Sequence, residues 1–222
     1  MYADDRDILA LEPALFIRLV WDHQLLAAGN GQIASGLLTT PASLPPAVGP
    51  GSVVRINEDT LYEITERTAP QSLRISRLRP GRLDPPIPPP DLPNLAFRIQ
   101  TFTPQIQLAS AELAERLNPD THPASFPPPP TSSDPAEWPA LSTPPARRPL
   151  LALLTAARAL SHIHRAAAEG IPDQVTGYLT RDLHMIKQRY YLALFHELLR
   201  LVPVVLRDGA IARLGEPHLY RA

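Results

Sequence analysis

Hydrophobic and polar residues alternate most regularly across residues 53–78, and this pattern predicts half-buried antiparallel β-strands. Tyr62 and Ile64 fall on one side of the alternation, while the residues between and beside them are polar. Short polar residues separate the segments and supply the turns. Because three strands cannot close a core alone, we expect two more, at 33–39 and 96–102, to complete a small sheet or barrel.

In the rest of the chain, apolar residues recur every three or four positions, which predicts amphipathic helices. Pro13, Pro104 and Pro149 suit the first turns of such helices, because an N–H is not needed there. The last two helices are joined by a short connection, so we expect them to pack antiparallel. Thr103 is the expected N-cap of the third helix, and Gly29-Asn30-Gly31 is expected to stop the second. The predicted helices cover residues 4–11, 13–28, 104–117, 149–169 and 174–202.

Proline-rich segments interrupt these elements. Residues 84–90 predict a stiff extended loop, and residues 119–149 predict an irregular linker with some polyproline character. After Pro203, the Asp208-Gly209 pair favours a β-hairpin over residues 203–213. An extended tail with one sharp turn is the alternative. A lone hairpin is marginal in water, so we expect it to pack on the body or on a partner chain.

The elements together predict an α+β fold. Its mainly helical body consists of the long antiparallel helix pair and the N-terminal helices, and a small antiparallel β-sheet or barrel is inserted into it. An extended C-terminal tail or hairpin follows. The expected domains are a helical body over 1–31 and 103–202 with the linker 119–149 inside it, an inserted β module over 32–102, and a tail over 203–222.

Composition narrows the classes of function. The chain has 222 residues with a formal net charge of -1, so no global basic field indicates nucleic-acid binding. The absence of cysteine excludes disulfides and thiolate metal sites. The N-terminus is acidic, unlike a signal peptide, and no apolar run reaches the roughly 18 residues of a membrane helix. We therefore expect a soluble protein with no membrane partner.

The sequence contains no recognisable catalytic, cofactor-binding or metal-binding motif. His162 and His164 lie two residues apart on a predicted helix, so they point to different faces and cannot share a metal. His184 and His196 are too far apart along one helix. Gly29-Asn30-Gly31 lacks the Lys-Ser/Thr ending of a phosphate loop. We expect no catalytic residue, no cofactor and no metal, and therefore a protein that is not an enzyme.

One local basic cluster follows the central strands. At a sheet edge such a cluster could meet phosphates, or it could protect the edge or form intersubunit salt bridges. The strand acids Glu63 and Glu66 are interpreted as ordinary solvent-exposed carboxylates. The cluster comprises Arg74, Arg77, Arg79 and Arg82.

Four segments carry a family resemblance: DDRDILALEPALF near the start, LYEITERTAPQSLRISRLRP in the strands, TFTPQI before a helix, and RYYLALFHELLRL before the tail. With the order of helix, β module, helix, helix pair and tail, they resemble the head–tail adaptor (connector, neck) proteins of tailed bacteriophages. The resemblance covers most of the chain. The proline-rich segments depart from it.

This resemblance implies a structural virion protein that forms a ring, a dodecamer, beneath the portal and continues the DNA channel to the tail. It implies portal and tail or neck proteins as partners, passing contact with DNA without sequence specificity, assembly in the host cytoplasm, and a final place in the virion neck. In this family, C-terminal segments of the adaptor bind the portal. The positions implied here are Val204, Val205, Arg207, Asp208, Arg213, Tyr220 and Arg221.

Three alternatives stay open from the sequence. The chain could be another neck or tail-completion protein that binds the tail side. It could be a small-ligand or carbohydrate-binding β module, which would need a concave site with aromatic and polar groups. It could be an enzyme, although no arrangement of catalytic residues supports this; bound zinc in a metal assay would reopen that hypothesis. A domesticated relative in a bacterial genome would have the same sequence features as a virion protein.

Overall fold

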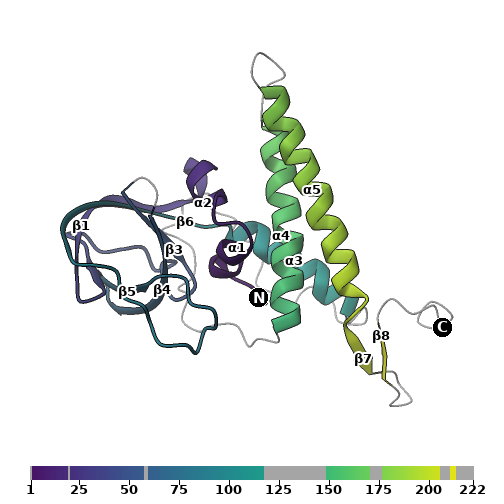
Figure 1. Ribbon diagram of the computed structural model, residues 1–222, viewed down its shortest axis with the longest axis horizontal. Helices are drawn as coiled ribbons and strands as arrows, with labels where there is room; N and C mark the ends of the chain where they lie inside the picture. The colour runs from purple at the N-terminus through teal and green to yellow at the C-terminus, as the bar shows by residue number, and fades with distance from the viewer. Residues whose placement is uncertain are drawn as a thin grey trace. The chain divides into compact units, whose positions relative to one another are not determined.

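The computed structural model describes residues 2–19, 21–57, 60–117, 149–170, 177–205 and 211–213 (Figure 1). The order of elements begins with short helical turns, continues through six strands, and ends with three longer helices and two short strands. The elements are α1 (Asp5–Leu11), α2 (Leu15–Arg18), η1 (Asp22–Gln24), β1 (Leu25–Ala34), β2 (Leu37–Thr39), β3 (Val53–Ile56), β4 (Thr60–Ala69), β5 (Ser72–Ser76), β6 (Leu92–Gln100), α3 (Thr103–Leu117), α4 (Pro149–Glu169), α5 (Gly177–Leu199), β7 (Pro203–Val205) and β8 (Ile211–Arg213).

The chain divides into two compact units. One contains residues 4–103, which hold α1, α2 and the six strands β1 to β6. The other contains residues 1–3 together with α3, α4, α5 and the strands β7 and β8. Among the described residues, none of the helices is long and apolar enough to cross a membrane.

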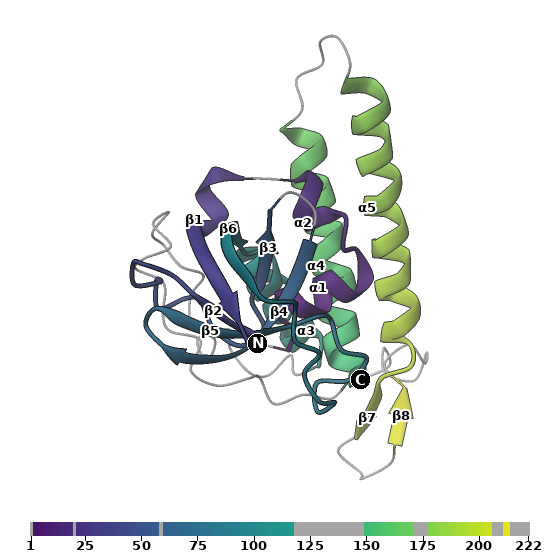
Figure 2. The same ribbon diagram turned by 60° about the vertical axis from the view of Figure 1, so that its left-hand side comes forward.

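The six strands of the first unit form a closed barrel in the order β1-β2-β5-β4-β3-β6, with every neighbouring pair antiparallel. Figure 2 shows β1, β6 and β3 running alongside one another on one side of it. Pairing of β1 with β6 closes the barrel, and a closed sheet leaves no edge strand exposed.

The barrel interior is filled by the apolar side of each strand's alternation. Tyr62 and Ile64 of β4 and Leu73 and Ile75 of β5 are all buried, which confirms the period-two pattern in that region. Burying a side chain of this size contributes on the order of 2 kcal/mol. The barrel core consists of Leu26, Ile33, Leu38, Leu44, Ala47, Val48, Val54, Ile56, Tyr62, Ile64, Leu73, Ile75, Leu95, Phe97 and Ile99.

The helix predicted over 13–28 is wrong in most of its length. The structure has only α2 and the single turn η1 there, and from Leu25 onward the backbone is the long strand β1. Gly29-Asn30-Gly31, expected to stop a helix, lies inside β1 and pairs with β6. The physical reason is that pairing with two neighbouring strands overrides a weak local helical preference. The single strand expected at 33–39 is likewise the end of β1, a turn at Ser35-Gly36, and β2.

Three helices make up most of the second unit. Helix α4 has the predicted boundaries, and α3 begins one residue before the predicted start. Helix α5 ends at Leu199, three residues before the predicted end, and its predicted residues 174–176 lie outside the described residues. Helices α4 and α5 lie side by side in both views (Figures 1 and 2). Their shared core includes Leu154, Ala157, Phe195 and Val202. Leu113 brings α3 into the same cluster.

The fold class predicted from the sequence is therefore wrong: the body is not mainly helical with a small insertion. A closed six-stranded barrel is one of the two compact units, and the N-terminal helix α1 belongs to it. The local hydrophobic pattern did not predict β1, because this segment becomes a strand through its pairing with β2 and β6. After α5, β7 pairs antiparallel with β8, as predicted for the hairpin and not for the extended tail.

Candidate functional site

The first polar cluster of the barrel unit is centred on Glu63 of β4. This carboxylate is 1% exposed and forms ion pairs with Arg6 of α1 and Arg79. Arg79 donates from Nε at 2.5 Å and from its backbone N–H at 3.1 Å to the same carboxylate oxygen. The interpretation of Glu63 as an exposed strand acid is wrong, because its side chain points to the α1 side, where two guanidinium groups replace water. Glu66 is exposed, as interpreted.

A second group of ion pairs extends this cluster along α1. Arg82 donates to the carboxylates of Asp4 and Asp7, the latter at 3.1 Å. The carbonyl of Gly51 accepts the backbone N–H of Arg6 at 2.9 Å. Gly51 has a φ of 91°, and a Cβ there would lie 2.1 Å from a carboxylate oxygen of Asp4, so only glycine permits this approach. The clusters of Glu63 and Arg82 together hold α1 on the barrel.

The four arginines of the predicted basic edge are thus not equivalent. Arg79 and Arg82 belong to the ion pairs around α1. Arg74 forms an exposed pair with Glu66 at 3.1 Å, and Arg77 is exposed. A closed barrel has no edge for them to line. Three of the four arginines therefore form ion pairs with carboxylates, two of them in the cluster around α1, which weakens the case for phosphate binding by this cluster.

Asp5 is a buried acid, 2% exposed, that the sequence did not single out. One carboxylate oxygen accepts the backbone N–H of Phe102 at 2.7 Å. Burial raises the pKa of Asp5 from 3.8 to about 7, and the hydrogen bonds from Thr101 and Phe102 only partly offset that rise. Asp5 joins α1 to the chain just after β6.

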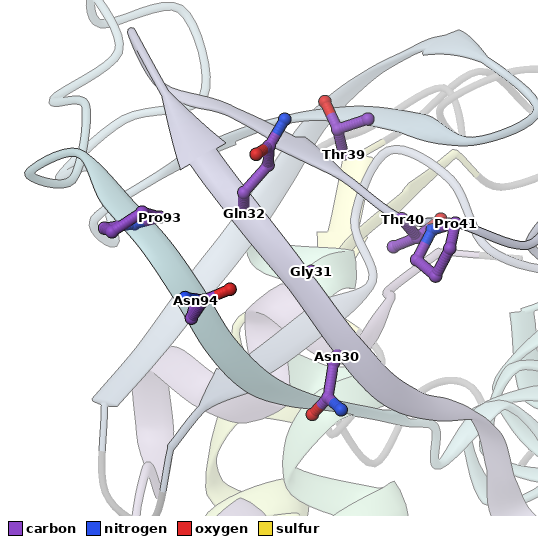
Figure 3. A pocket seen from close by; sticks show the side chains of 8 residues that line it. All are labelled: Asn30, Gly31, Gln32, Thr39, Thr40, Pro41, Pro93 and Asn94. Carbon is purple, nitrogen blue, oxygen red and sulfur yellow. The ribbon is translucent and has the colours of Figure 1, made fainter.

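A shallow pocket of about 340 Å³ lies on the outside of the barrel (Figure 3). Its wall is neutral: carboxamides and hydroxyls alternate with proline rings, and no charged or aromatic side chain takes part. Three aromatic residues of the barrel unit, Tyr62, Phe97 and Phe102, are all buried and cannot line this pocket. The pocket therefore lacks the stacking platform that the ligand-binding alternative requires. It is lined by Asn30, Gly31, Gln32, Thr39, Thr40, Pro41, Pro93 and Asn94.

Gly31 on the pocket floor is required by the closeness of β1 and β2. A Cβ added there would lie 2.8 Å from the carbonyl oxygen of Thr39, so the backbone must shift. We expect Gly31→Ala to lower the free energy of unfolding by about 1–3 kcal/mol. Gly29→Ala on the same strand is the matched control, because its Cβ would lie 3.5 Å from Phe97 in ordinary contact. Equal urea midpoints for the two variants would contradict this prediction.

In the helical unit, Glu112 of α3 binds two side chains of α4. Its oxygens accept from Arg158 at 2.5 and 3.3 Å, and His162 lies 3.2 Å away. Burial lowers the pKa of His162, although Glu112 partly opposes this. A histidine beside a carboxylate is a common catalytic pair, but here Arg158 occupies both oxygens of Glu112. The cluster joins α3 to α4.

A histidine pair connects α4 to α5. The Nδ1 atoms of His164 and His184 lie 2.8 Å apart, so one ring must donate and the other accept. Tyr191 stacks on His164 with a centroid distance of 5.7 Å. Sequence reasoning compared histidines only within one helix and missed this pair. A comparison between the two helices could have found it, because His164 lies five residues before the end of α4 and His184 lies seven residues after the start of α5.

The remaining predicted positions lie at the C-terminus. Val204 is in β7, opposite Ala212, and Arg213 ends β8, opposite Pro203. Val205 pairs with Ile211. The predictions for Arg207, Asp208, Tyr220 and Arg221, and for the linker 119–149, lie outside the described residues.

Within the part of the chain that the structure describes, no three histidine, aspartate or glutamate side chains gather closely enough to hold a metal ion. Comparison of the chain with protein-family models, curated proteins and solved structures found no match. Evidence for the function therefore comes from the side chains and surfaces of the two units.

Proposed function

We propose that this chain is a structural assembly protein, a head-to-tail adaptor that forms a ring beneath the portal of a tailed bacteriophage and continues the DNA channel to the tail. It acts by binding proteins, not by catalysing a reaction. The helical unit would supply the body of the ring, and the C-terminal segment 203–222 would bind the portal.

The observation that carries the proposal is the hairpin after α5. Strands β7 and β8 form a two-stranded sheet separate from the barrel. A sheet of two strands is marginal in water by itself, and each strand has a second side whose backbone groups can pair with another chain. Strand addition by a partner protein would complete such a sheet. The position of the hairpin at the C-terminal end of the helical unit agrees with the portal-gripping segment that the resemblance implies.

The test is assembly with the cognate portal protein, measured by particle mass and negative-stain imaging. We expect rings when the protein and the portal are mixed, and we expect deletion of residues 203–222 to abolish them while the helical content is unchanged. The double variant Gln32→Ala/Asn94→Ala on the barrel pocket is the control and should still assemble. If the protein remains a monomer when mixed with the portal, the proposal is wrong, and a neck protein that binds the tail side is favoured.

A further inference from the structure

The face of α5 that points away from α4 carries an apolar stripe. Leu183, Ile186 and Tyr190 are 45%, 63% and 61% exposed, whereas Tyr191 and Phe195, which pack against α4, are buried. Single exposed apolar residues are ordinary. A stripe spaced three and four residues apart along one helix is instead the pattern by which helices pair through their a and d positions. This face of α5 is therefore suited to a second helix.

The charged residues beside the stripe indicate that the second helix is α5 of another copy of the chain. Asp182 and Arg189 are both exposed and lie seven residues apart, two turns along the same border of the stripe. If a second copy of α5 lies antiparallel across the first, Asp182 of each copy meets Arg189 of the other. One twofold axis thus creates two ion pairs from a single sequence, which is the property of a self-complementary interface.

We propose that, in the absence of the portal, this protein is a dimer in which the exposed faces of two α5 helices pack antiparallel. Leu183 of one copy then packs against Ile186 of the other, near the twofold axis. The apolar stripe supplies most of the affinity, and the charges of Asp182 and Arg189 at its border select the antiparallel orientation. The proposal concerns the protein alone and does not depend on the adaptor function. A ring with head-to-tail contacts between neighbours would have to use this face differently.

The first test is sedimentation equilibrium of the full chain over micromolar concentrations. We expect a dimer, and we expect Ile186→Glu to weaken it at least about tenfold because a carboxylate then lies on the apolar contact. Met185→Glu is the matched control: Met185 is 39% exposed on a different side of the same helix, and its variant should dimerise like the unaltered protein. Circular dichroism checks that both variants keep their helices. A monomer at all concentrations would overturn the proposal.

The second test exchanges the charges of Asp182 and Arg189 at the border of the stripe. Asp182→Arg and Arg189→Asp should each weaken the dimer, because each places like charges opposite one another. The double variant Asp182→Arg/Arg189→Asp restores both pairs with reversed sign and should dimerise nearly as well as the unaltered protein. A double variant as weak as either single variant would show that these residues do not face each other across the interface.

The third test measures orientation. The chain has no cysteine, so a spin label can be placed at one site through Ala193→Cys, an exposed position on α5. In the antiparallel register the two labelled positions are separated by about 22 Å along the helix axis. A parallel pair would bring them side by side, and a short distance would therefore contradict the antiparallel arrangement. Portal binding is measured separately, so failure of one proposal leaves the other testable.

Discussion

Replacing Glu63 with Gln is expected to destabilise the barrel unit by about 3–5 kcal/mol, the usual cost of breaking a buried ion pair from one side. Among the described residues, Glu63 is the carboxylate that forms ion pairs with both Arg6 and Arg79. An amide can accept a hydrogen bond from one guanidinium, but it leaves two cations without their shared negative charge. Urea unfolding followed by circular dichroism measures the change.

The control for Glu63 is Glu66→Gln, the same chemical change three residues later on β4. Glu66 and Arg74 form an exposed pair at 3.1 Å, and pairs of that kind contribute about 0–1 kcal/mol. We therefore expect the control to unfold at almost the same urea concentration as the unaltered protein. Two variants with equally small losses would show that α1 is held on the barrel by packing, not by the charges around Glu63.

Asp5 is expected to make the stability of the barrel unit depend on pH. Its pKa in the folded protein is raised to about 7 from 3.8, so between these pH values the folded protein retains a proton that the unfolded chain has released. The stability that this proton contributes is fully present below about pH 4 and is lost as the pH rises to about 7. Linkage converts the shift into a loss of about 4 kcal/mol across that range.

The measurement is urea unfolding at several pH values between about 4 and 8 for the unaltered protein and for Asp5→Asn. The asparagine keeps an oxygen to accept the N–H of Phe102 but has no proton to release, so this part of the slope should disappear. Asp91→Asn is the matched control, because the Asp91 carboxylate also accepts one backbone N–H at 2.7 Å, from Ser35, but is exposed. If Asp5→Asn keeps the original slope, another group causes it.

The helical unit was the most predictable part of the fold. Helix α4 begins at Pro149 as predicted, and α3 begins at Thr103, which was predicted as its N-cap, because caps and prolines act within one turn of a helix. The same local chemistry located the β4–β5 hairpin, where alternation and turn residues occur together. These elements were predictable because their determinants lie within a few residues of them.

The candidate surfaces were predictable only in part. The hairpin β7–β8 followed from Pro203 and the turn residues, and the 3-4 spacing of apolar residues on α5 was visible in the sequence. Which side of α5 remains exposed was not, because that depends on the rotation of α5 against α4. The His164–His184 pair required the two helices to be aligned about their turn.

What the sequence by itself determined is therefore local: the ends of α3 and α4, the alternation in β4 and β5, and the polar turns between strands. Only the tertiary structure decided that Leu25 to Ala34 is a strand, since its conformation comes from pairing with β2 and β6. The same holds for Glu63, whose alternation predicted an exposed acid. Arg6 lies 57 residues away in the chain, and no local pattern can place a charge beside a partner at that distance.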